Sequence, residues 1–157
     1  MRYIIDGYNL LFALELKPHP IEHSREALIE VLIEDLVQLH MRATIVFDSG
    51  TTHLGSFPHL HDRNGIEIVF SPHGMCADRY ILEIIEGAKN PKDTVVVSDD
   101  AELRASSLAL HAKTMMCAPF LQKMRRKNRK KHPPTKQTPH DPAYDEELQR
   151  IFEERLE

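Results

Sequence analysis

Carboxylates follow apolar segments in this sequence, in a pattern typical of an acidic site at the edge of a sheet. Asp6 ends the run RYIID, Asp48 follows TIVF, and Asp99 and Asp100 follow VVVS. A further acidic position, Asp78, stands in CADRYI at the start of a helical pattern. Carboxylates held close together raise one another's pKa, and a bound cation relieves their repulsion. The pattern therefore predicts a divalent metal site.

Oxygen ligands of this kind suit Mg²⁺, which is commonly held by one or two carboxylates and several waters, and Mn²⁺ is equally compatible. An ion beside a phosphodiester can activate a water and neutralise developing charge. The sequence thus indicates a metal-dependent nuclease with Asp6, Asp78 and Asp100 as ligands. Gly7 is expected to permit a tight turn after Asp6, and Asn9, one helical turn on, to orient water or phosphate.

Each carboxylate also has a purely structural interpretation, because an Asp after a strand is often a turn former or a helix N-cap. Asp48, in FDSG, is explained as well by a cap or an outer supporting role as by metal ligation. Of Asp99 and Asp100, one is expected to cap the following helix while the other faces the metal. The sequence favours Asp100 as the ligand and keeps Asp99 as its competitor.

The elements that would position these residues alternate between strands and helices. Apolar runs predict buried strands at 2–6, 43–48, 66–70, 94–98 and 113–117, and one-sided apolar spacing predicts helices at 21–40, 77–88 and 101–110. Ser49 to Asn64 lacks periodicity, so a mobile loop beside the site is expected there. The alternation predicts an α/β fold with a mainly parallel sheet between two helical layers, and with ligands at the carboxyl ends of the strands.

Basic residues are concentrated near the C-terminus, although the formal net charge is only −4. Most positions from 123 to 131 are cationic, namely Lys123, Arg125, Arg126, Lys127, Arg129, Lys130 and Lys131. A solvated helix end is the alternative, but this density of charge favours contacts with RNA phosphates. Such contacts would add affinity without sequence selectivity and would hold the strand over the acidic site.

The remaining features predict one cytoplasmic domain with a tail. Its 157 residues suffice for one hydrophobic core, and no apolar run approaches membrane-spanning length. Cys76 and Cys117 lack disulfide or zinc spacing, so we expect reduced thiols. The Pro-rich stretch after Lys131 predicts an extended linker, and Tyr144 to Leu156 has the spacing of a short amphipathic helix.

Ten histidines raise the possibility of zinc, but none forms the spacing of a zinc protease. His53, His59, His61 and His73 are therefore expected to be exposed loop residues.

Four motifs in this order resemble the YacP-like branch of the NYN domain family, within the PIN-like nucleases: IDGYN, VFD, CADRYI and VVVSDD. The resemblance covers about residues 1 to 125. It implies a PIN-like three-layer α/β sandwich, and the residues themselves place the end of this domain at 128, with the basic and Pro-rich linker and the C-terminal helix at 129–157. It also implies an Mg²⁺- or Mn²⁺-dependent endoribonuclease acting on single-stranded RNA, in some members in association with the ribosome.

Asp6, Asn9, Asp78 and Asp100 match the active-site positions of that family, whereas Cys76 replaces a small polar residue common before Ala-Asp. Two other functions stay open. A non-catalytic RNA-binding or ribosome-associated adaptor would use the same basic run. Phosphotransfer would use an Asp after the first strand, although the Asp-Xaa-Asp of the phosphatase type is missing.

Overall fold

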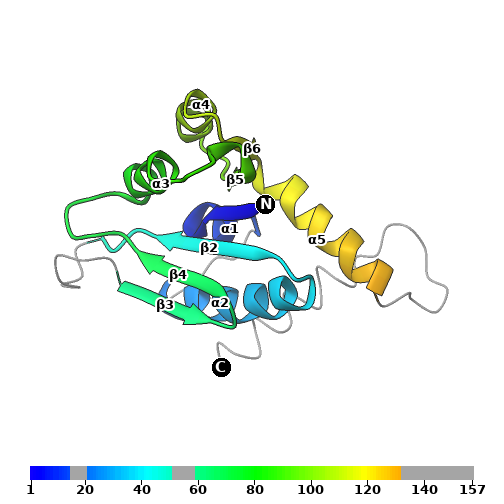
Figure 1. Ribbon diagram of the computed structural model, residues 1–157. Helices are drawn as coiled ribbons and strands as arrows, with labels where there is room; N and C mark the ends of the chain where they lie inside the picture. Colours follow the sequence, from blue (N-terminus) through cyan, green and yellow to red (C-terminus); the bar gives the residue numbers. More distant parts are fainter. Residues whose placement is uncertain (15–20, 51–58, 132–157) are drawn as a thin grey trace.

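One six-stranded sheet, in the order β3-β4-β2-β1-β5-β6, organises the described part of the chain (Figure 1). The computed structural model describes residues 1–14, 21–50 and 59–131. The parallel strands are β1 (Arg2–Asp6), β2 (Arg42–Phe47), β4 (Ile66–Phe70), β5 (Thr94–Val97) and β6 (Lys113–Met115), with β3 (His59–Arg63) antiparallel at one edge. The helices are α1 (Gly7–Ala13), α2 (Ile21–Gln38), α3 (Ala77–Glu86), α4 (Ala101–Ala109) and α5 (Cys117–Lys131), and η1 (Pro91–Asp93) is a 3₁₀ turn.

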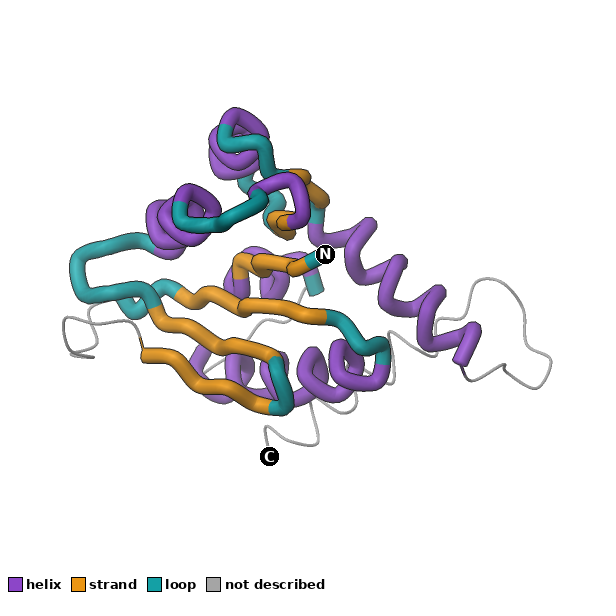
Figure 2. The backbone as a smooth tube through the Cα atoms, in the orientation of Figure 1, coloured by secondary structure: helices purple, strands orange, loops and turns teal. Residues whose placement is uncertain are grey.

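Helices cover both faces of the sheet because strand side chains alternate between two apolar cores. Tyr3 and Ile5 of β1 pack in a cluster with α1, α2 and α5, while Ile4 between them packs in a second cluster with α3 and α4. Figure 2 shows α2 on one side of the strands and α3 and α4 on the other. The predicted three-layer α/β sandwich with a mainly parallel sheet is therefore confirmed.

The loop predicted from Ser49 to Asn64 is wrong from His59 to Arg63, because these residues form β3 in a hairpin with β4. The register runs from His59 opposite Phe70 to Arg63 opposite Ile66. Asn64 and Gly65 connect the strands with positive φ angles of 56° and 82°, as a two-residue hairpin turn requires. His59 and His61 therefore belong to an edge strand, whose polar sequence carries no apolar run.

Several predicted features lie outside the described residues. They are residues 51–58 of the expected loop with His53, the Pro-rich linker after Lys131, and the helix expected at 144–156. Helix α5 itself continues to Lys131, past the boundary expected at Asn128.

Two findings bear on the expected cellular context. None of the helices in the described ranges is both long and apolar enough to cross a membrane. Cys76 is exposed and Cys117 is buried, and both are free thiols.

The strand order places the topological switch point of the sheet between β1 and β5. The chain adds β2 and β4 on one side of β1 and then crosses to build β5 and β6 on the other. From the carboxyl ends of β1 and β5 the chain therefore enters helices on opposite faces, α1 on one and α4 on the other. Ligands of open α/β sheets bind at such a point. Asp6 and the residues after Val97 leave the sheet here.

Gly7 is needed for close packing rather than for the tight turn expected from the sequence. It is the first residue of α1, and a Cβ atom there would lie 2.4 Å from Cε1 of the buried Phe47. The Phe47 ring is itself held between Tyr8 and Phe70, with ring centroids at 5.1 and 5.7 Å. Phe47 therefore has little room to move away from an added methyl group.

Gly7→Ala should lower the free energy of unfolding by about 1–3 kcal/mol, the usual cost of overpacking a filled core. Gly87→Ala is the matched control, because the nearest atom to its added Cβ is the Glu83 carbonyl oxygen at 3.4 Å and its backbone is right-handed helical. Urea titration followed by circular dichroism measures both variants. Equal losses in the two variants would contradict this account of Gly7.

Candidate active site

Asp6 is a buried carboxylate at the carboxyl end of β1, with 4% of its surface exposed. Its Oδ1 accepts a hydrogen bond from the backbone N–H of Asn9 at 3.3 Å. Its Oδ2 accepts from Asn9 Nδ2 at 2.7 Å and from the Ser98 hydroxyl at 3.2 Å. Asp6 thereby caps α1 and bonds to the residue that follows β5. These bonds fix the carboxylate at the switch point.

Burial raises the pKa of Asp6 to about 6, and the negative charge of Asp78 adds to this shift. The hydrogen bonds from Asn9 and Ser98 act in the opposite direction, because they favour the ionised form. Keeping the Asp6 carboxylate ionised at neutral pH therefore costs free energy, and a bound cation would reduce this cost.

Asp78 lies in the first turn of α3, and its pKa is also raised. Burial is the largest cause, and the negative charges of Asp100, Asp48 and Glu102 add to the shift. The fold therefore brings Asp6, Asp78, Asp100 and Asp48 close enough for their charges to interact. Glu102 belongs to the same group, although the sequence analysis did not select it.

Asp99 and Asp100 both bond to helix N-termini, whereas the sequence analysis expected only one of them to do so. Oδ1 of Asp100 accepts from the backbone N–H of Leu103 at 2.9 Å and caps α4. Oδ1 of Asp99 accepts from the backbone N–H of Cys117, the first residue of α5, at 2.9 Å. The two adjacent carboxylates thus hold two different helices.

Asp48 forms a local turn after β2. Its Oδ1 accepts from the backbone N–H of Gly50 at 2.7 Å, and Gly50 has a φ of 57°. This is the turn-forming geometry left open by the FDSG sequence. The charge of Asp48 nevertheless raises the pKa of Asp78, so it contributes to the field of the site.

Ser98 is a fully buried member of the site that the sequence analysis did not select. Its hydroxyl donates to Asp6 and accepts from the backbone N–H of Asp100 at 3.1 Å. Its carbonyl oxygen accepts from Nη1 of Arg104 at 3.0 Å. The sequence does contain a signal for this role, because Ser98 is the hydroxyl residue that directly follows the apolar run VVV and precedes the acidic pair.

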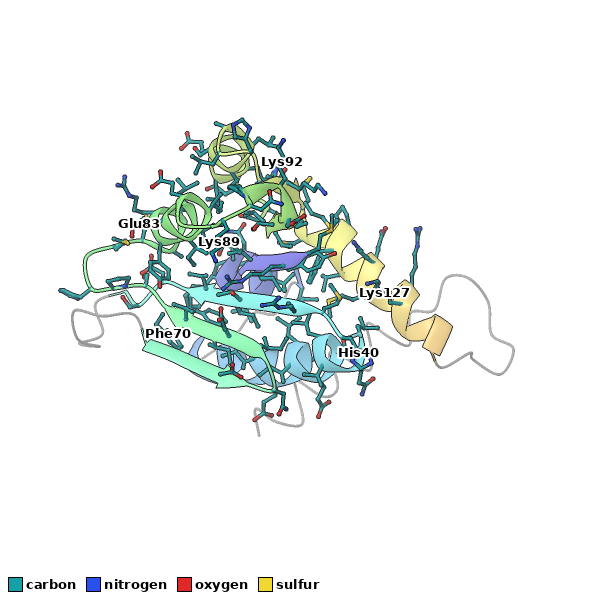
Figure 3. All side chains as sticks on the ribbon, viewed as in Figure 1. His40, Phe70, Glu83, Lys89, Lys92 and Lys127 are labelled. Atoms are coloured by element: carbon teal, nitrogen blue, oxygen red, sulfur yellow. The ribbon has the colours of Figure 1, made fainter. Side chains whose placement is uncertain are left out.

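The basic cluster lies toward the opposite end of α5 from the acidic edge. α5 starts at Cys117, and at 1.5 Å per residue Lys127 is about 15 Å further along its axis. Nζ of Lys123 donates to the Tyr3 hydroxyl at 2.6 Å, near the beginning of β1. Figure 3 shows Lys127 well apart from Phe70, which ends β4.

The cations predicted to contact RNA phosphates therefore lie some distance along α5 from the carboxylates. Arg126 and Lys127 are exposed, Arg125 is half-buried and Lys123 is engaged by Tyr3. The side chains of Arg129, Lys130 and Lys131 lie outside the described part of the chain.

The acidic residues fit a hydrated ion better than a closed protein cage. In the ranges that the structure describes, no three His, Cys, Asp or Glu side chains form a ready set of metal ligands. Mg²⁺ and Mn²⁺ need no such set, because one or two carboxylates and several waters suffice. The mutually repelling Asp6 and Asp78, next to Asp100, supply oxygen donors of that kind.

The fold and the acidic edge define an α/β protein with a carboxylate site at its switch point. Residues 3–157 match the YacP-like NYN domain, so the chain belongs to this family. The match also spans the C-terminal residues that the motif resemblance did not cover. Family membership supports a nuclease-type function on RNA.

The fold resembles that of Rae1 (YacP) from Bacillus subtilis. Its crystal structure aligns with a TM-score of 0.64 at 18% identity, covering 99% of this chain and 83% of that chain. A point mutant of the same protein gives 0.63 at 21% identity, with 82% and 77% covered. At these identities the likeness establishes the fold alone. No curated protein sequence matches this chain.

Asp6→Asn should change how stability depends on pH. The pKa of about 6 in the folded protein lies above the ordinary aspartate pKa of 3.8, so the stabilising contribution is complete below about pH 4 and is lost as the pH rises through 6. Relative to wild type, the variant should gain up to about 3 kcal/mol between pH 4 and pH 7.5, at about 1.36 kcal/mol per pKa unit. Urea titrations in EDTA at both pH values measure this difference. A difference that stays constant with pH would refute the raised pKa.

Proposed function

We propose that this chain is a metal-dependent endoribonuclease that cleaves single-stranded RNA in the cytoplasm. The observation that carries the proposal is the buried Asp6 carboxylate, whose pKa is raised by burial and by Asp78 at the switch point of the sheet. Perturbed carboxylates gathered where α/β sheets bind ligands are candidates for catalytic groups. Membership of the NYN family supports the same class of reaction.

Asp6 and Asp78 would hold Mg²⁺ or Mn²⁺ together with Asp100. The ion would supply an activated water and neutralise charge on the phosphate. The protein's own contribution is orientation. Asn9 and Ser98 donate to Asp6 and keep it fixed and ionisable, which matters because active-site groups stabilise charge best when they do not reorganise. Asp48 would support the site through its charge on Asp78.

The basic end of α5 would bind a flanking part of the RNA rather than the phosphate that is cut. Exposed Arg126 and Lys127 can neutralise backbone phosphates, and Arg125, Arg129, Lys130 and Lys131 would extend this contact. The strand would then run between the basic end of the helix and the acidic edge where the helix begins. Ribosomal RNA offers the same phosphates, so this cluster would also serve for docking on the ribosome.

Asp6→Asn and Asp78→Asn should each reduce cleavage of unstructured RNA by at least about 100-fold, the scale of losing one preorganised charged or polar group. Cleavage by wild type should require Mg²⁺ or Mn²⁺ and stop in EDTA. Asp93→Asn makes the same chemical change in η1, which precedes β5. Asp93 therefore lies at the opposite end of the strand from the acidic site, and this variant should keep activity. A gel assay with labelled RNA measures all three variants.

The adaptor function is the second candidate, because the exposed Arg126 and Lys127 of α5 could bind RNA phosphates without any chemistry at the acidic site. It predicts that purified protein binds RNA equally well with and without EDTA and cuts none. That result, with Asp6→Asn and Asp78→Asn behaving as wild type in cells, would replace the nuclease proposal.

Replacing Arg126 and Lys127 together by Gln should weaken RNA binding regardless of sequence. The slope of log K against log salt concentration should decrease in magnitude by about 1.4, since each phosphate contact on a single strand contributes about 0.7. Gln at both Lys89 and Lys92 is the matched control, because these lysines are exposed and Figure 3 shows them apart from Lys127. Fluorescence anisotropy over a salt series measures the slopes. Equal effects of both double variants would rule out a specific role for α5.

A further inference from the structure

We infer that Asp99 is a positioning residue that ties helix α5 to the Asp6 carboxylate, and that it is not a ligand of the metal. The inference rests on the proposed nuclease function. It assigns a role to the acidic position that the sequence leaves in competition with Asp100.

The side chain of Asp99 holds the start of α5. Its Oδ1 accepts from the backbone N–H of Cys117 at 2.9 Å. The first amides of a helix have no partner inside the helix, and a carboxylate there also interacts favourably with the helix dipole. This oxygen is therefore already occupied by the protein in a stabilising contact.

The backbone of Asp99 holds the other end of the connection. Its N–H donates to Oδ1 of Asn9 at 3.2 Å. The same Asn9 amide donates through Nδ2 to Oδ2 of Asp6 at 2.7 Å. A continuous path thus runs from the N-terminus of α5 through Asp99 and Asn9 to Asp6. A displacement of α5 would shift the backbone that orients the Asn9 amide.

The hydrogen bonds separate Asp99 from its neighbour. Asp100 bonds to Leu103 in the first turn of α4, and its charge raises the pKa of Asp78. Asp99 bonds to the first residue of α5 through its side chain and to Asn9 through its backbone. Two adjacent carboxylates with the same capping chemistry therefore hold two different helices, and only Asp99 connects its helix to Asn9.

Through this connection α5 would help to place the Asp6 carboxylate in addition to binding RNA. The inner side of α5 packs through the buried Phe120 and Met124, and the exposed Arg126 and Lys127 lie on the same continuous helix. Asp99 is a hydrogen-bonded contact through which the position of α5 reaches Asn9 and Asp6. RNA held at the basic end would in this way favour the correct placement of the carboxylate.

The test compares Asp99→Asn, Asp99→Ala and Asp100→Asn in the full chain. Asn retains a carbonyl oxygen that can accept from Cys117, so Asp99→Asn should cleave RNA within about twofold of wild type. Ala removes the acceptor and should reduce cleavage at least about tenfold, as for other groups that orient a metal ligand. Asp100→Asn should lose activity as Asp6→Asn does. Hydrogen exchange of the first α5 amides should be faster in Asp99→Ala and unchanged in Asp99→Asn.

Two outcomes would overturn the inference: Asp99→Asn as inactive as Asp6→Asn while its α5 amides stay protected, or Asp99→Ala fully active. If Asp99→Ala does not fold, Cys117→Pro, which removes the N–H donor of the same bond and keeps Asp99, replaces it. If wild type cuts no RNA, the nuclease proposal fails, but the connection through Asp99 can still be tested. NMR then decides the connection, because loss of the Asp99 carboxyl group should shift the side-chain amide signals of Asn9, and unchanged signals would refute it.

Discussion

The buried carboxylate of Asp6 is the constraint on which the rest of the site depends. An ionisable group with 4% of its surface exposed is costly to keep charged unless hydrogen bonds or a cation compensate it. Asn9 and Ser98 supply the hydrogen bonds, and they come from α1 and from the end of β5. The group that is hardest to bury therefore also joins the two halves of the sheet at its switch point. A divalent ion would complete the compensation that these bonds begin.

Helix N-termini supply a second form of compensation at the same edge. α1, α3, α4 and α5 begin there, and Asp6, Asp78, Asp100 and Asp99 respectively lie at or bond to their first turns. The positive end of each helix dipole stabilises a nearby carboxylate. Capping and a functional acidic site are therefore not exclusive roles in this fold. Helix capping keeps the carboxylates together, and their remaining repulsion is what a bound cation would relieve.

α5 begins at the acidic edge and carries its exposed cations away from it, although one RNA strand is expected to contact both. Its first residue bonds to Asp99 at the acidic edge, while Lys123 already contacts Tyr3 near the beginning of β1. The exposed cations of the helix lie still further along it. Binding along the flank of an RNA and cutting at the sheet edge are thus compatible with one continuous strand. The hydrogen bond between Asp99 and Cys117 would connect the two regions.

The sequence by itself determined the parallel sheet, the helical layers and the edge at which Asp6, Asp78 and Asp100 meet, because apolar periodicity and strand ends are local properties. It did not reveal β3, whose polar residues form a strand only by pairing with β4, although Asn64-Gly65 was a usable turn signal. Only the tertiary structure decided that Gly7 is needed for contact with Phe47, that Asp99 bonds to α5 and that Lys123 is engaged by Tyr3. Each of these roles depends on a partner far away in the chain, whose distance and direction no local pattern encodes.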